Sequence, residues 1–235
     1  MTPDRVNQPR GRAPGSPGGP PGLDPQTRGL VRVAIAVATG DTAALKERLL
    51  GARAAQTPER WVDELLLQSL LNVGYALGLQ AFAVWRDVSP APAPAGSETL
   101  SHEAWRDWAE RGPRVCGAVY GRTYHKLLVN LRALHPALET LVVVDAYGKL
   151  IGRDGLDLKR RELCTLAEIA VLDTPRQLHA HLRGALNTGS APEEVDEALA
   201  LVEQDVGAER ALRAWELWAD VRGRNLGTRK SERGT

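Results

Sequence analysis

The stretch GLDLKRRELCTLAEIAVLDTPRQLHAHLRGALNTG, residues 155–189, decides how this sequence should fold. Asp157 is a favourable N-cap, and apolar residues recur at helical spacing after it, so we expect a helix over residues 158–172. From Leu163 onward this helix is apolar on almost every side. Such a pattern predicts a helix buried in the centre of the fold.

A second helix should follow directly. Thr174, with Gln177 three residues later and a proline between them, forms a capping-box pattern. His181 falls on the apolar stripe of this second helix, so its imidazole should point inward. Glu162 lies on the antiparallel neighbour. We therefore expect a carboxylate and an imidazole to meet in one pocket.

The first part of the chain repeats this unit at an offset of 133 residues. Matching positions include Asp caps, small residues and a tryptophan: Leu23/Leu156, Asp24/Asp157, Arg28/Arg161, Gly51/Gly184, Gly74/Gly207 and Trp85/Trp218. Gly29 stands opposite Glu162 and Arg48 stands opposite His181, so the first copy lacks the acid–base pair. The duplication predicts one active pocket per chain, built mainly by the second copy.

These patterns divide the chain into five segments. Residues 1–21 are rich in Pro, Gly and Arg and are expected to be a disordered tail. The first, degenerate helical repeat covers 22–86, a linker and connecting helices cover 87–154, and the second repeat covers 155–222. Residues 223–235 are expected to be a flexible C-terminal tail.

Composition narrows the classes of function. Of the 235 residues, 43% are hydrophobic and 25% are charged, which is ordinary for a globular protein. A net charge of +1 gives no basic field, so we expect no nucleic-acid partner. We find no apolar run long enough for a bilayer and no secretory signal, and expect a cytoplasmic protein without a membrane partner. The two cysteines, Cys116 and Cys164, have no metal-ligand spacing, so no metal is expected.

The second repeat resembles a known family. The motifs that carry the likeness are Gly155-Leu156-Asp157, Arg161-Glu162-Leu163, Gln177-Leu178, His181, Gly184 to Asn187, Gly189 and Pro192 to Val195. Together they look like the carboxymuconolactone decarboxylase family, which shares the alkylhydroperoxidase D fold. The resemblance implies an all-α fold made of a duplicated helical unit with extra linking helices. It also implies a homo-oligomer, and a duplicated chain would form a trimer where single units form hexamers.

The resemblance also implies an activity. Peroxide-reducing members of this fold carry Cys-x-x-Cys before the histidine, but here the two positions are Thr174 and Gln177. This departure favours a cofactor-free lyase that decarboxylates a small carboxylated lactone such as 4-carboxymuconolactone, in aromatic compound catabolism. His181 would be the proton donor and Glu162 its partner or the base. A peroxiredoxin-like antioxidant protein and a non-catalytic helical oligomer are the alternatives.

Each candidate site residue also has a structural interpretation. His181 is either catalytic or a satisfied core histidine, and Glu162 is either its partner or a first-turn acid that stabilises the helix. Arg161 either holds a substrate carboxylate or forms a structural ion pair, as its counterpart in the first copy suggests. Asn187 either binds a substrate carbonyl or ends its helix. Glu168, in mid-helix among apolar residues, must find an arginine or stay protonated, and it is a further substrate-binding candidate.

Overall fold

All regular structure in the described part of the chain is helical. The computed structural model describes residues 22–95 and 100–232, and the expected tail at residues 1–21 lies outside them. The all-α prediction is confirmed, since no described residue is part of a strand.

The first repeat consists of α1 (Pro25–Thr39), α2 (Thr42–Ala54) and α3 (Glu59–Val88). Inside α3 the backbone leaves helical geometry at Gly74, with φ 74° and ψ 176°. Only glycine adopts this conformation without steric cost. The long helix is therefore two helical arms joined at Gly74.

The second repeat consists of α7 (Leu158–Val171), α8 (Pro175–Asn187), α9 (Pro192–Val206) and α10 (Ala208–Glu232). Thr174 stands at the N-cap of α8, but its side chain makes no capping hydrogen bond, so the predicted capping box is wrong although the helix begins where expected. Helix α10 continues to Glu232, so the C-terminal segment expected as a flexible tail from residue 223 is helical as far as that residue.

Local details of the two repeats match in space. Each first helix is capped by an aspartate that accepts from the backbone N–H three residues ahead. Gly207, with φ 87° and ψ 156°, separates α9 from α10 as Gly74 divides α3. In each copy a buried tryptophan donates its indole N–H to an aspartate on the helical segment before the glycine: Trp85 to Asp63 at 2.9 Å and Trp218 to Asp196 at 2.6 Å.

The copies face each other through reciprocal ion pairs. Arg161 of α7 binds Glu64 of α3 at 2.8 Å, and its counterpart Arg28 of α1 binds Glu197 of α9. The first helix of each copy thus contacts the third helix of the other, while α1 and α7 pack together between them. This exchange is the contact pattern of an approximate two-fold axis within one chain.

The connecting region adds a second layer against α8. It contains η2 (His102–Ala104), α4 (Trp105–Tyr120), η3 (Gly121–Thr123), α5 (Tyr124–Leu134), α6 (Ala137–Thr140) and a π-helix, η4 (Leu141–Ile151). α4 and η4 touch backbone to backbone, since a Cβ at Gly112 would lie 2.1 Å from the Val143 carbonyl oxygen, and one at Gly148 would lie 2.2 Å from that of Trp108. Glycine at both positions therefore fixes this pair of helices.

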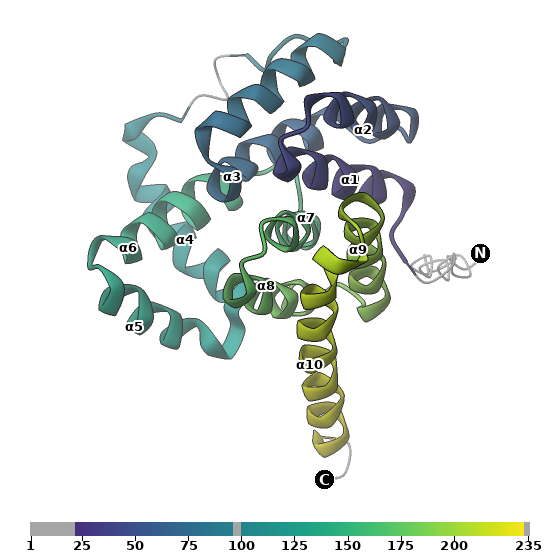
Figure 1. Ribbon diagram of the computed structural model, residues 1–235. Coiled ribbons are helices and arrows are strands. Elements are labelled where there is room, and N and C mark those ends of the chain that lie inside the picture. The colour runs from purple at the N-terminus through teal and green to yellow at the C-terminus, as the bar shows by residue number, and fades with distance from the viewer. Residues whose placement is uncertain (1–21, 96–99, 233–235) are drawn as a thin grey trace, which may run out of the picture.

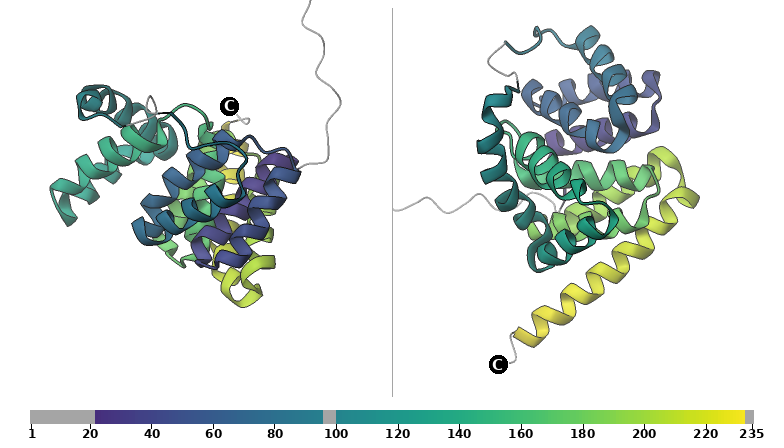
Figure 2. Two further views of the ribbon diagram at one scale, coloured as in Figure 1. Left: turned by 90° about the horizontal axis from the view of Figure 1, so that it is seen from above. Right: turned by 90° about the vertical axis from the view of Figure 1, so that its left-hand side faces the viewer.

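Helix α7 lies at the centre of the molecule (Figure 1). It contacts α1, α3, α8, α9 and α10, and every residue from 161 to 171 is buried, as its apolar pattern predicts. Figure 2 shows the two repeats as neighbouring halves, with the far end of α10 extending away from them. The central position of α7 means that polar side chains on it must find partners inside the fold.

One helix departs from the expectation about membranes. Within residues 22–95 and 100–232, α3 is the helix long and apolar enough, by length and composition, to cross a bilayer, so the statement that no such run exists is wrong. A third of the apolar window, 33%, is buried inside the fold, and Gly74 interrupts the helix. Core helices have the same composition.

Candidate acid–base site

A partly buried hydrogen bond joins α7 to α8. The Nδ1 atom of His181 lies 2.9 Å from Oε2 of Glu162. The glutamate side chain is 1% exposed and the histidine side chain 13%, so the imidazole lies at the edge of the core. An ionised carboxylate can only accept, so Nδ1 carries the hydrogen and Nε2 is the ring atom left for chemistry.

Gly184 makes room for this pair. A Cβ at Gly184 would lie 2.4 Å from Oε2 of Glu162 and 2.9 Å from a methyl carbon of Val119. The absence of a side chain therefore lets the carboxylate lie against α8. In the first copy a Cβ at the equivalent Gly51 would meet nothing within 4 Å.

Two tyrosines from the connecting region line the imidazole side of the site. The ring of Tyr120, at the end of α4, stands edge-on to His181 with centroids 6.3 Å apart, and Tyr147 of η4 packs edge-on against Tyr120 at 6.0 Å. Burial raises the pKa of Tyr120 to about 12 and that of Tyr147 well above its usual value. Tyr120 is thus a neutral hydrogen-bond donor at physiological pH.

The cysteines do not supply a reactive thiolate. Both are buried and free. Burial, reinforced by the Glu162 charge, raises the pKa of Cys116 to about 12, and burial raises the pKa of Cys164 well above its usual value. Nucleophilic thiols in enzymes have a lowered pKa and access to solvent. The local environment therefore opposes thiol chemistry at either residue.

The Glu168 side chain is completely buried, and its hydrogen-bond partners do not include an arginine. Its Oε1 lies 2.5 Å from Ser69 Oγ, and its Oε2 accepts from Asn72 Nδ2 at 2.6 Å. The Ser69 hydroxyl also donates to the Leu65 carbonyl at 2.8 Å. Since a hydroxyl has one hydrogen, both contacts are satisfied only when protonated Glu168 donates to Ser69. Burial raises the pKa of Glu168 to about 7. The carboxyl belongs to the contact between α7 and α3.

Arg161 is occupied by the fold. It is completely buried, and besides Glu64 it donates to Gln68 Oε1 at 3.1 Å and to the carbonyls of Leu156 at 3.0 Å and Arg153 at 3.1 Å. These contacts leave it no free donor face for a substrate. The geometry thus favours the structural ion pair over the substrate-binding role for Arg161.

Asn187 ends α8 and holds the end of α4. Its Nδ2 donates to the Val119 carbonyl at 2.7 Å, and a Cβ at Gly121 would lie 3.2 Å from the same nitrogen. The side chain is exposed and also lines two cavities beside α8. Asn187 therefore positions the segment that carries Tyr120.

The first copy has no equivalent pair among the residues that the structure describes. Gly29 packs against the backbone of Ala52, where a Cβ would come within 3.1 Å. Arg48 points to Asp205 of α9, at 3.1 Å. Arg48, which occupies the position of His181 in the first copy, thus forms a contact between the two repeats.

Two cavities lie along the outer face of α8. The cavity toward α10 has a volume of about 350 Å³ and the groove toward α5 about 390 Å³. Neither is lined by Glu162 or His181, but Tyr120 lines the groove and contacts the imidazole. Residues 22–95 and 100–232 contain no cluster of His, Cys, Asp and Glu able to hold a metal ion.

The described residues thus form a duplicated all-α unit with a carboxylate–imidazole pair in one copy and two buried cysteines. Residues 140–220 match the model of the Carboxymuconolactone decarboxylase family, so this region of the chain is a domain of that family and the resemblance is confirmed.

Two curated relatives share part of the chain. It is 31% identical over 88 residues to Peroxisomal protein 2 of Saccharomyces cerevisiae, which is 37% of this chain and 31% of that protein. It is 26% identical over 133 residues to Peroxisomal protein 2 of Schizosaccharomyces pombe, which is 56% of this chain and 62% of that protein. The chain thus spans about a third of one relative and under two thirds of the other. The names of both relatives refer to the peroxisome and not to the cytoplasm, and they state no reaction.

Proposed function

We propose that this protein is a cofactor-free lyase that removes carbon dioxide from a small carboxylated lactone or a related acid. The observation that carries the proposal is the 2.9 Å hydrogen bond between the buried Glu162 and His181, which one copy of the repeat has and the described residues of the other lack. The first copy folds without this pair, since Gly29 and Arg48 stand at the two positions. Such pairs concentrate at functional sites.

The chemistry follows from the groups present. The bond between the substrate's carboxylate carbon and the ring breaks, carbon dioxide leaves, and the electron pair spreads into the conjugated lactone carbonyl. Tyr120, a neutral donor with a pKa near 12, holds the oxygen on which negative charge develops. Imidazolium His181 then delivers a proton to carbon and is reprotonated from solvent. Glu162 orients the ring and stabilises its charged form.

The peroxiredoxin-like alternative has less support. It needs an accessible thiolate and a resolving thiol, whereas both cysteines are buried and burial raises the pKa of each. The non-catalytic oligomer is favoured by one observation: the cavities described do not reach His181. A substrate would have to displace Tyr120 or enter beside it.

Self-association and location remain proposals. Large apolar side chains of α3 are exposed, with Leu71 at 42%, Tyr75 at 74% and Leu79 at 63%. This face supports the proposed trimer, which sedimentation would test. The expected cytoplasmic location competes with a peroxisomal one, because both relatives are named as peroxisomal proteins. Imaging of the tagged protein would decide between the two.

Release of carbon dioxide from 4-carboxymuconolactone tests the reaction. The full chain is compared with His181→Ala, Glu162→Gln and Tyr120→Phe, and with His102→Ala as a control for loss of an exposed histidine elsewhere. We expect turnover by the wild type and the control, and a fall of about a hundredfold or more for His181→Ala, the scale of a lost general acid. Folded wild type without turnover would overturn this substrate. Full activity of both His181→Ala and Glu162→Gln would overturn the assigned roles.

A further inference from the structure

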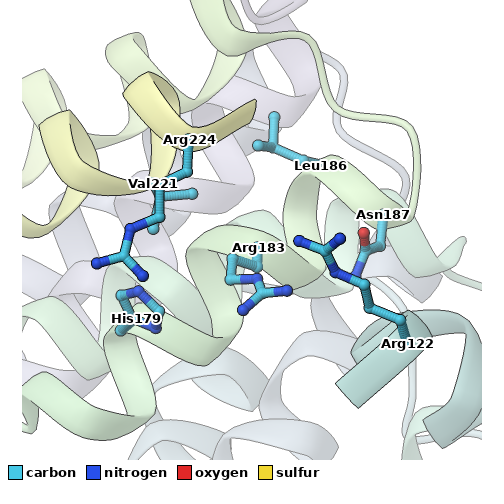
Figure 3. Close-up of a pocket in the computed structure, with 7 residues that line it drawn as sticks. All are labelled: Arg122, His179, Arg183, Leu186, Asn187, Val221 and Arg224. Carbon is cyan, nitrogen blue, oxygen red and sulfur yellow. The ribbon is translucent and has the colours of Figure 1, made fainter. Parts of the chain in front are cut away.

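An arginine-rich cavity lies between α8, α10 and the α4–α5 turn (Figure 3). We call it the arginine pocket. Its cationic or polar lining residues are Arg122, His179, Arg183, Asn187 and Arg224, and its apolar wall is Leu186 with Val221. Arg122 and Arg183 reach this cavity from different segments, the turn after α4 and α8, and both are labelled in Figure 3.

Two of these arginines have no counter-ion in the described part of the chain. Arg224 lies 2.9 Å from Asp220, and His179 lies 3.6 Å from the same carboxylate. Arg122 and Arg183 form no ion pair or hydrogen bond with any described residue, and no carboxylate lines the cavity. Two guanidinium groups that line one cavity repel each other, and an anion bound between them would offset this repulsion.

The groove toward α5 continues this pocket and adds apolar surface. It shares His179, Arg183 and Asn187 with the arginine pocket. On its other wall, apolar side chains form a strip beside polar ones: the apolar residues are Val119, Tyr120, Leu127, Leu131 and Leu134, and the polar ones are Thr123, Lys126 and Asn130. Arg176 and Gln177 of α8 line it as well. No acidic residue lines the groove either. The two cavities together present cationic side chains beside an apolar strip of α4 and α5 that includes Tyr120.

We propose that the arginine pocket and the α5 groove form one binding site for an amphipathic anion, an unbranched or aromatic chain with an oxyanion head group. Arg122 and Arg183 bind the head, because guanidinium groups pair with carboxylate or phosphate oxygens through two parallel hydrogen bonds. The leucines of α5 cover the chain. Binding at this site does not require that the protein be a lyase.

The ligand's two parts explain features that neither cavity explains alone. A free inorganic anion would leave the leucines of α5 exposed to water, and a neutral apolar ligand would leave two arginines without a partner. An amphipathic anion satisfies both. Its chain would lie beside Tyr120, the side chain that separates the groove from His181.

Titration calorimetry on the full chain tests the site with octanoate, octyl phosphate, octanol and inorganic phosphate. We expect the octyl anions to bind more tightly than octanol or phosphate, and the tighter of the two identifies the head group. From butanoate to octanoate the affinity should rise about threefold to fourfold per methylene, the effect of burying each CH₂. Binding should weaken as salt is raised.

Paired variants separate this site from general charge effects. Arg122→Gln with Arg183→Gln should weaken octanoate binding about a hundredfold, about tenfold for each charged hydrogen-bonding group. Arg106→Gln with Arg114→Gln removes the same charge from exposed positions of α4 outside the cavities and should leave binding unchanged. Should the double pocket variant misfold by circular dichroism, the exposed single Arg122→Gln replaces it with an expected loss of about tenfold.

Equal affinities of the pocket and control variants would overturn the proposal. So would an affinity that does not change with chain length, which would mean a simple anion site. Octanoate binding that persists while 4-carboxymuconolactone is not turned over would leave this site intact and remove only the lyase. Turnover of 4-carboxymuconolactone without octanoate binding would overturn the proposed anion site and leave the lyase proposal intact.

Discussion

Replacing Glu168 by glutamine should make the protein more stable at high pH. The buried carboxyl has a pKa of about 7 against an ordinary value of 4.5. Because the folded state binds a proton more tightly than the unfolded state, this group lowers the free energy of unfolding as the pH rises from about 4.5 to 7. At lower pH both states are protonated, and the penalty disappears.

The magnitude follows from the size of the shift. One pKa unit corresponds to about 1.4 kcal/mol, so ionising Glu168 should cost about 3 kcal/mol at pH 8 and about 1.4 kcal/mol near pH 5.5. Glutamine reproduces the protonated acid: its amide N–H donates to Ser69, and its oxygen accepts from Asn72. Glu168→Gln should therefore match the wild type near pH 4 and exceed it by about 3 kcal/mol at pH 8.

Urea unfolding followed by circular dichroism from pH 4 to 8.5 measures the difference. All other titrating groups are common to the two proteins, so they cancel. Glu216→Gln, an exposed glutamate of α10, is the control and should show no pH-dependent difference. A stability difference for Glu168→Gln that stays constant with pH, or a variant that is less stable at pH 8, would refute the buried neutral carboxyl.

The repeat supplies matched controls for two further predictions. Gly184→Ala should cost about 1–3 kcal/mol of unfolding free energy, because its Cβ would meet Glu162 Oε2 at 2.4 Å. Gly51→Ala in the first copy has open space around the new Cβ and should stabilise the protein by up to about 1 kcal/mol. Equal effects of the two substitutions in thermal unfolding would contradict this prediction. Glu64→Gln leaves a buried arginine uncompensated and should cost about 3–5 kcal/mol, while Glu197→Gln, in a pair whose side chains are 42% and 24% exposed, should cost about 1 kcal/mol or less. Similar urea midpoints for the two variants would refute the difference in burial.

Local signals made the central hairpin predictable. The Asp157 cap and the apolar run after it place α7, and the stripe that contains His181 turns the imidazole toward Glu162. Comparison of the repeats also indicated that Arg161 is structural, because Arg28 stands in the same place. Short-range spacing carries this information, since residues three or four apart share a helix face.

The rest of the site depends on contacts between distant segments. Tyr120 comes from the connecting region, which has no counterpart in the repeat, and reaches His181 only because α4 packs on α8. The partners of Glu168 lie on α3 of the other copy, and Ser69 is 99 positions away from it in the sequence. Arg122 and Arg183 line the same cavity because the turn after α4 lies beside α8. A periodic pattern states which side of a helix is buried, but not which segment covers it.

The crosswise pairing of Arg28 with Glu197 and of Arg161 with Glu64 has a consequence for how such a chain changes over time. In a dimer of identical subunits every substitution appears twice, so a change that helps one half is also imposed on the other. Joining the halves in one polypeptide removes this constraint. One half can then do without the acid and the imidazole, as Gly29 and Arg48 illustrate, and its residues can instead stabilise the other repeat.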